Sequence, residues 1–264
     1  GPSGCGKSTL LELFKEYLKG EGVSDDNIIH INLELMKYDD VRHYKTFYTL
    51  ITEKIKNNDR CYLLIDEIQQ VDKWEKAINS MNVEFNVDIY ITGSNAYLLS
   101  SEISTLLSGR YVEIKMLPLS FKEYLEFDHL PHDWTLEDKF NQYLKFGSLP
   151  AVPTLPQDNT TINEFLLGIY NTVIVKDVIS RNNIKDIGLL EQIVKYVVAN
   201  TGNIISANKI SGYVSSQGRG ETTKATTVSN YLDMLEKAYI IYPVKRYDIK
   251  GKEQLKNLAK YYVV

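Results

Sequence analysis

The sequence predicts an α/β fold, in which a parallel sheet is covered by helices on both faces and is followed by a helical lid and a winged helix-turn-helix module. Short β-branched runs alternate with helical patterns over residues 1–118, which favours parallel strands joined by crossover helices. Residues 119–185 show only helical periodicity. Residues 186–264 contain three helical stretches and then two β-rich segments, which is the order of elements in a winged helix.

The patterns define individual elements. In the first part we expect strands at residues 28–32, 61–65, 87–92 and 111–116, with helices from residue 10, at 44–55 and near 72–79. The lid is expected to contain helices at 121–127, 136–146 and 162–179. The last module is expected to contain helices at 189–199, 207–215 and 227–237 before strands at 240–247 and 261–264.

Composition is that of an ordinary folded chain. Apolar residues make up 44% and charged residues 24% of the 264 residues. No stretch approaches the ~18–20 consecutive apolar residues of a membrane span, and no signal peptide is visible. The cysteines, Cys5 and Cys61, follow no zinc or redox spacing. We therefore expect a cytoplasmic protein without a membrane partner. A strand normally precedes the first motif, so we expect the sequence to be a fragment that lacks its first strand and is truncated C-terminally.

Charge is distributed unevenly. Residues 1–185 contain 19 Lys and Arg against 27 Asp and Glu, whereas residues 186–264 contain 11 against 7. A basic module on an acidic body indicates a polyanionic partner such as duplex DNA, although winged helices also contact proteins.

The first nine residues match the phosphate-binding pattern G-x-x-x-x-G-K-[ST] at every fixed position. Glycines allow successive backbone N–H groups to turn toward phosphate oxygens, and the following helix adds its positive end. Lys7 is expected to contact the β- and γ-phosphates and Ser8 to bind Mg²⁺. The candidate nucleotide-binding residues are Gly1, Pro2, Ser3, Gly4, Cys5, Gly6, Lys7, Ser8 and Thr9.

A second motif follows at residues 63–67, where an apolar strand ends in Asp66 and Glu67. Ligands of parallel sheets bind at the carboxyl ends of the strands, so Asp66 is expected to hold Mg²⁺ through water. Glu67 is placed to polarise the attacking water as a general base. The base-reading motif of GTPases is absent in the expected place, and an acidic pair after a phosphate-binding loop favours an ATPase.

Three further residues are candidates for the reaction. Ser94 and Asn95 follow the strand after the acidic pair, where a polar side chain reaches between Mg²⁺ and the γ-phosphate. Arg110 precedes the next predicted strand and has two interpretations. It either reaches the γ-phosphate of a neighbouring subunit in a homo-oligomer or forms an ordinary surface salt bridge.

Four local matches give the sequence a family resemblance: GKST, LLIDEIQQV, ITGSN and GRYVEIKMLPLSFKEY. Together they resemble the prokaryotic AAA-type ATPases that carry a C-terminal domain of unknown function. The resemblance implies an AAA+ core, ATP and Mg²⁺ as ligands, and a winged-helix segment. It also implies that Arg110 is an arginine finger and that Ser94 and Asn95 lie at sensor 1. The sequence departs from the pattern in lacking a sensor-2 arginine after the turn at Gly147.

Two functions remain open. In the first, the protein hydrolyses ATP in a Mg²⁺-dependent reaction and couples its nucleotide state to movement of the winged-helix module, with DNA as one candidate partner. In the second, it is a DNA- or protein-binding switch in which ATP is a structural ligand and turnover is negligible.

Overall fold

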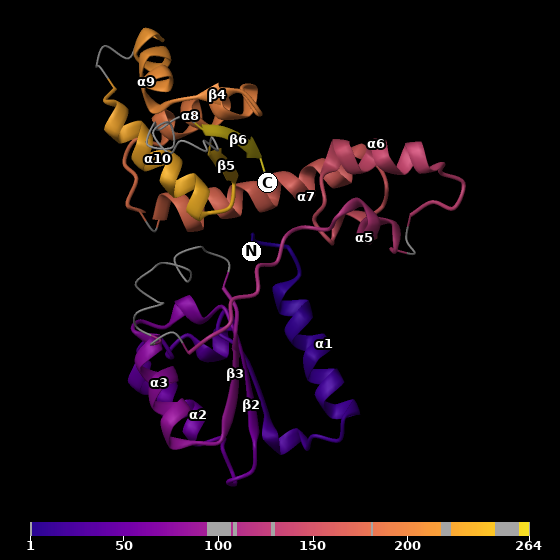
Figure 1. The fold of residues 1–264 in the computed structure, drawn as a ribbon, viewed down its shortest axis with the longest axis vertical. Coiled ribbons are helices and arrows are strands. Elements are labelled where there is room, and N and C mark those ends of the chain that lie inside the picture. Colours follow the sequence, from indigo (N-terminus) through magenta and orange to yellow (C-terminus); the bar gives the residue numbers. More distant parts are fainter. Residues whose placement is uncertain are drawn as a thin grey trace, which may run out of the picture. The chain divides into compact units, whose positions relative to one another are not determined.

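The structure is a computed structural model that describes residues 2–93, 107, 110–127, 130–180, 182–217, 223–245 and 259–263. The chain divides into two compact units, residues 3–117 and residues 118–264 (Figure 1). Each unit has its own hydrophobic core. None of the described helices is both long and apolar enough to cross a bilayer.

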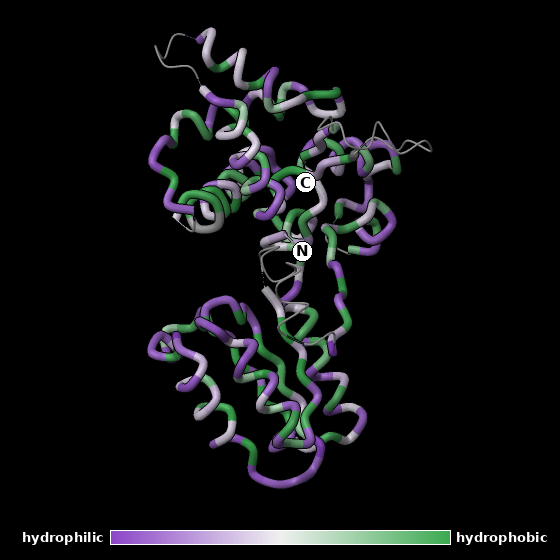
Figure 2. The backbone as a smooth tube through the Cα atoms, turned by 60° about the vertical axis from the view of Figure 1, so that its left-hand side comes forward, coloured by the Kyte–Doolittle hydropathy of each residue, from purple (hydrophilic) through white to green (hydrophobic). Residues whose placement is uncertain are grey.

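A parallel three-stranded sheet forms the centre of the first unit. Its strands are β1 (Ile28–Asn32), β2 (Cys61–Asp66) and β3 (Val87–Ile91), in the order β1-β2-β3. Leu63, Leu64 and Ile65 of the central strand are fully buried, because the sheet is covered on both faces. The apolar interior of this unit is visible as green segments in Figure 2. The predicted parallel α/β arrangement is confirmed.

Helices cover the two faces of this sheet. Helix α1 (Lys7–Gly20) lies on one side, and α2 (Tyr44–Thr52) and α3 (Trp74–Glu84) lie on the other (Figure 1). Helices α2 and α3 pack against the sheet through a continuous apolar core. Their buried residues in this core include Phe47, Ile51, Ala77 and Met81.

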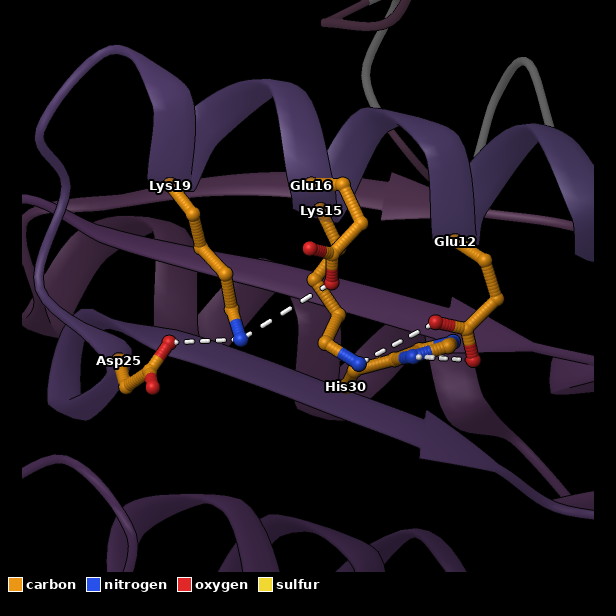
Figure 3. Close-up of polar contacts among 6 residues, drawn as sticks. All are labelled: Glu12, Lys15, Glu16, Lys19, Asp25 and His30. Carbon is orange, nitrogen blue, oxygen red and sulfur yellow. Dashed lines mark hydrogen bonds and ion pairs between the residues drawn. The ribbon is translucent and has the colours of Figure 1, made fainter.

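Helix α1 is attached more through polar contacts, since only Leu11 and Leu18 of this helix are buried. Glu12 lies between Lys15 and His30, and its two carboxylate oxygens are each 3.2 Å from one of these partners (Figure 3). Lys19 approaches Asp25 at 2.9 Å, beside the start of β1 (Figure 3). The contacts with His30 and Asp25 join α1, which begins at the phosphate-binding loop, to β1 and to the turn before it.

The prediction of a strand at residues 111–116 is wrong. Residues 110–117 have no regular secondary structure, and the apolar side chains of Val112, Ile114 and Leu117 are 89%, 76% and 75% exposed. An alternating apolar run becomes a strand only where a neighbouring strand pairs with its backbone, and no described strand pairs with this segment.

The second unit begins with well-capped helices. Helix α5 (Phe121–Leu125) and helix α6 (Leu136–Phe146) both start with capping boxes, formed by Ser120 with Glu123 and by Thr135 with Asp138. Aromatic rings join the two helices: the centroids of Phe121 and Phe140 are 5.0 Å apart, and those of Tyr124 and Tyr143 are 5.3 Å apart.

The long helix predicted at residues 162–179 has a different form in the structure. Helix α7 (Asn159–Val173) starts earlier, because Asp158 caps it, and it continues as a π-helix over Ile174–Ser180. Val173 and Val178 are both buried and are five residues apart, which is the hydrogen-bonding repeat of a π-helix. The wider turn therefore directs both side chains into the core of this unit.

The C-terminal elements occur in the predicted order, with one addition. They are α8 (Ile187–Ala199), β4 (Ile204–Ile205), α9 (Ala207–Ser216), α10 (Ala225–Lys237), β5 (Ile241–Lys245) and β6 (Ala259–Val263). The strands form an antiparallel sheet of order β4-β6-β5. Buried residues of all three helices share one core with Ile205 and Ile241 of the sheet.

Candidate nucleotide-binding site

The phosphate-binding loop has the backbone geometry that its glycines predict. Gly4 and Gly6 have φ angles of +78° and +93°, a region that other residues rarely adopt. Gly6 is the N-cap of α1, and no side chain caps this helix end. Backbone N–H groups of the first turn are therefore available to an anion, as in other phosphate sites at helix N-termini. Gly1 lies outside the described residues.

Cys5 and Lys7 are close to each other in this loop. Cys5 is 3% exposed, and Lys7 Nζ lies 3.8 Å from its Sγ. The buried thiol packs under the loop and contacts the ammonium group that is expected to meet phosphate.

Asp66 is the buried charged residue at the end of the central strand, with only 1% of its surface exposed. Asn32, its register partner at the end of β1, donates from Nδ2 to Asp66 Oδ2 at 3.3 Å. The hydroxyl of Thr92, just beyond β3, donates to Asp66 Oδ1. Neighbouring strands on both sides thus orient one buried carboxylate, because the carboxyl ends of parallel strands meet at one edge of the sheet.

Glu67 follows in a left-handed conformation with φ of +57°. Its backbone N–H donates to Thr92 Oγ1 at 3.3 Å, and its carboxylate accepts a hydrogen bond from the Gln69 amide. Burial raises the pKa of Glu67 above its ordinary 4.5, and the charges of Glu34 and Asp66 act in the same direction. The Gln69 hydrogen bond and the positive charge of Lys7 lower the pKa of Glu67.

The remaining predicted residues are Ser94, Asn95 and Arg110. Ser94 and Asn95 lie outside the described residues. Arg110 is exposed, and its backbone N–H donates to Leu107 O at 3.0 Å. Among the described residues, the guanidinium of Arg110 forms no ion pair, so the predicted alternative of an ordinary salt bridge gains no support from this part of the chain.

Sequence reasoning missed Asn32, Thr92 and Gln69. Asn32 ends β1 and Thr92 directly follows β3, and these positions next to the central strand were the signal that the sequence offered. Their contacts with Asp66 depend on the register of the strands. The only indication in the sequence that Gln69 contacts Glu67 was its position two residues further along the chain.

The donor set fits a hydrated Mg²⁺ beside nucleotide phosphates. Mg²⁺ prefers oxygen ligands and keeps several waters, so one fixed carboxylate and one hydroxyl are enough from the protein. Asp66 supplies an oriented carboxylate, and Ser8 supplies a hydroxyl in the first turn of α1.

The parallel sheet and the phosphate-binding loop form a fold of the P-loop ATPase type. Residues 1–125 match the family model described as "AAA domain", and residues 137–264 match the one described as "Domain of unknown function (DUF8612)". The chain therefore contains an AAA domain that is followed by a C-terminal domain of unknown function, as the sequence predicts.

Relatives occur in bacteria and archaea. An uncharacterized protein of Haemophilus influenzae is 41% identical over 261 residues, which are 98% of this chain and 64% of the relative. An uncharacterized protein of Methanocaldococcus jannaschii is 30% identical over 271 residues, covering 97% of this chain and 57% of the relative. The chain thus spans less than two thirds of the length of either relative.

Two solved structures are similar to this chain. The Walker-type ATPase PABY2304 of Pyrococcus abyssi matches with a TM-score of 0.50 at 15% identity, covering 97% of this chain and 74% of that protein. The Aeropyrum pernix Orc1 protein in complex with DNA matches with a TM-score of 0.41 at 13% identity, covering 100% of this chain and 81% of that protein. At 15% identity the likeness to the Walker-type ATPase concerns the fold alone. We draw no conclusion from the match with a TM-score of 0.41.

Proposed function

We propose that this chain binds ATP with Mg²⁺ and hydrolyses the γ-phosphate. The observation that carries the proposal is the arrangement at the end of β2. There Asp66 is buried and oriented by two donors, and Glu67 follows it directly in a turn that is bonded to Thr92. A phosphate-binding loop alone supports binding, whereas an oriented acidic pair next to it supports hydrolysis.

Each residue has a distinct role in this proposal. The loop from Gly1 to Thr9 holds the phosphates, and Lys7 neutralises their charge. Ser8 and Asp66 hold the Mg²⁺, which when bound offsets negative charge on the β- and γ-phosphates. Glu67 accepts a proton from the attacking water. Because burial raises the pKa of this carboxyl, Glu67 is a stronger base than an exposed glutamate, which favours proton transfer.

Three residues would complete the site. Ser94 and Asn95 are proposed to contact the γ-phosphate or its water from the segment after β3. Arg110 is proposed to act on the γ-phosphate of a neighbouring subunit in a homo-oligomer. Its exposure supports this role, because a residue that acts across an interface has to be accessible in the single chain.

The nucleotide state is proposed to control the position of the C-terminal elements. We assign residues 1–118 to the ATPase core, 119–185 to a helical lid and 186–264 to a winged-helix module. The three helices and the β4-β6-β5 sheet support the winged-helix assignment. Duplex DNA is a candidate partner of helix α10, whose N-terminal end carries the polar side chains of Thr226, Thr227 and Ser229.

Measurement of ATP binding and turnover by the purified chain, with and without Mg²⁺ and duplex DNA, tests the proposal. We expect Mg²⁺-dependent turnover, and we expect Lys7→Ala to remove most ATP affinity because the buried phosphates lose a charged partner. Lys54→Ala, at an exposed position on the same unit, is the matched control. Unchanged ATP binding by Lys7→Ala would contradict the site. Tight binding without turnover would favour the alternative in which ATP is a structural ligand.

A further inference from the structure

The small sheet of the second unit has two different faces. In its antiparallel register Tyr242 is opposite Tyr262, and Lys260 is opposite both Val244 and Ile204. Side chains alternate between the faces of a strand, so these five residues share one face. The opposite face packs against the helices, where Ile205, Ile241 and Ala259 are at most 9% exposed.

We call this side of the sheet the outer face. All five of its residues are exposed: Ile204, Tyr242, Val244, Lys260 and Tyr262. Tyr242 is 62% exposed and Tyr262 is 41% exposed, which is unusual for two large rings on neighbouring strands. Neither ring stacks on another aromatic ring of the described chain. Lys260 is exposed and forms no ion pair with any described residue.

Positive charge is concentrated in the same part of the sequence. Residues 241–264 contain six Lys and Arg against two Asp and Glu, whereas residues 186–240 contain five against five. The whole basic excess of the C-terminal module therefore falls in residues 241–264 of the sequence. Four of these six basic residues lie outside the described residues, and Lys260 is the described basic residue of the outer face. The acidic residues Asp233 and Glu236 of α10 act on Tyr261, on the inner face, where burial and then their charges raise the pKa of the phenol.

The exposed tyrosine rings and the basic residue beside them together indicate the chemistry of a binding partner. Exposed aromatic rings on a sheet stack against bases, and basic groups beside them contact phosphates, which is how unpaired strands are bound without sequence preference. In a duplex the faces of the bases stack on one another inside the double helix, so they cannot stack on exposed tyrosine rings. A purely apolar protein partner would not require the basic excess.

We propose that the outer face binds single-stranded nucleic acid, with bases stacked on Tyr242 and Tyr262 and the backbone contacted by Lys260. This site is separate from the proposed duplex contact of α10, which lies within residues 186–240, where basic and acidic residues are equal in number. The inference does not depend on ATP hydrolysis, because both tyrosines and the lysine belong to the C-terminal sheet.

The test uses the full 264-residue chain and a fluorescein-labelled oligodeoxythymidylate. A labelled DNA hairpin with the same number of nucleotides is the duplex used for comparison. We expect binding at low salt and preference for the unpaired strand in fluorescence anisotropy. Tyr242→Ala and Tyr262→Ala should each weaken binding roughly tenfold. Tyr242→Phe and Tyr262→Phe keep the stacking ring and are the matched controls, with affinities close to that of the unsubstituted chain.

Lys260→Gln provides a second, independent measurement that does not alter the rings. Loss of one phosphate contact should reduce the slope of log affinity against log salt by about 0.7. Circular dichroism should show an unchanged fold, since Lys260 is exposed. Absence of oligothymidylate binding at low salt overturns the proposal. Equal binding of duplex and single strand, unaffected by the alanine variants, also overturns it. Loss of self-association on Tyr242→Ala without any oligothymidylate binding would instead assign the face to a protein contact.

Discussion

The hydroxyl of Thr92 donates a hydrogen bond to the carboxylate of Asp66, across two neighbouring parallel strands. The same hydroxyl accepts a hydrogen bond from the backbone N–H of Glu67 at 3.3 Å. One side chain therefore orients the proposed Mg²⁺ ligand and the turn that carries the proposed general base.

Replacement of Thr92 tests this dual contact. Thr92→Val keeps the shape but removes the hydroxyl, which leaves the buried Asp66 carboxylate with fewer donors. We expect a loss of roughly 1–3 kcal/mol in the free energy of unfolding, measured by chemical denaturation, together with weaker Mg²⁺-dependent nucleotide binding. Thr92→Ser keeps the hydroxyl and is the control. Equal stability of the two variants would show that the hydroxyl does not hold Asp66.

The proposed role of Arg110 predicts complementation between subunits. A mixture of Arg110→Ala and Lys7→Ala chains should regain part of the ATPase activity, because a site with an intact Lys7 can then receive an intact Arg110. Arginine fingers contribute on the order of 10³ or more in rate, so the recovery should be easily measured. Activity that is independent of protein concentration and shows no complementation would exclude action across an interface.

The capping box of α6 predicts a specific pH dependence of stability. Hydrogen bonds from the Thr135 hydroxyl and backbone lower the pKa of Asp138 below its ordinary 3.8. A group with a lowered folded-state pKa stabilises the fold above its unfolded pKa, and this contribution is lost as the pH falls through the folded value.

Asp138→Asn should therefore lower the melting temperature at neutral pH, measured by circular dichroism, and the difference should shrink below pH 3.8. Glu137→Gln removes a charge from the same first turn without removing a capping contact, so it serves as the control. An Asp138→Asn effect that is the same at all pH values would mean that the carboxylate contact does not contribute.

Local patterns in the sequence were sufficient for much of the fold. The strand Ile28–Asn32 and the helix Leu136–Phe146 have the predicted bounds, because a β-branched run and an amphipathic period between clear caps are local signals. The positions of Lys7 and Asp66 followed from motifs of fixed spacing, and the loop geometry at Gly4 and Gly6 agrees with them.

Features that depend on pairing could not be predicted from local patterns. Residues 111–116 have the alternation of a strand but no described partner, whereas Ile204–Ile205 is too short to show a pattern and still pairs with β6. The contacts of Asn32 and Thr92 with Asp66 depend on the register of three strands. The π-helix after Val173 was predicted as a continuation of the α-helix, because a helical run of apolar residues does not distinguish the two helix types.

The central claim is that Glu67 makes this chain a hydrolase, and Glu67→Gln tests it most directly. The variant keeps the size of the side chain and the neighbouring Asp66, but it cannot accept a proton from water. Glu53→Gln, an exposed substitution of the same kind, is the control. We predict that Glu67→Gln binds MgATP normally and hydrolyses it at least roughly a hundredfold more slowly, as expected for loss of a general base. Hydrolysis at the rate of the unsubstituted chain would show that Glu67 has only a structural role.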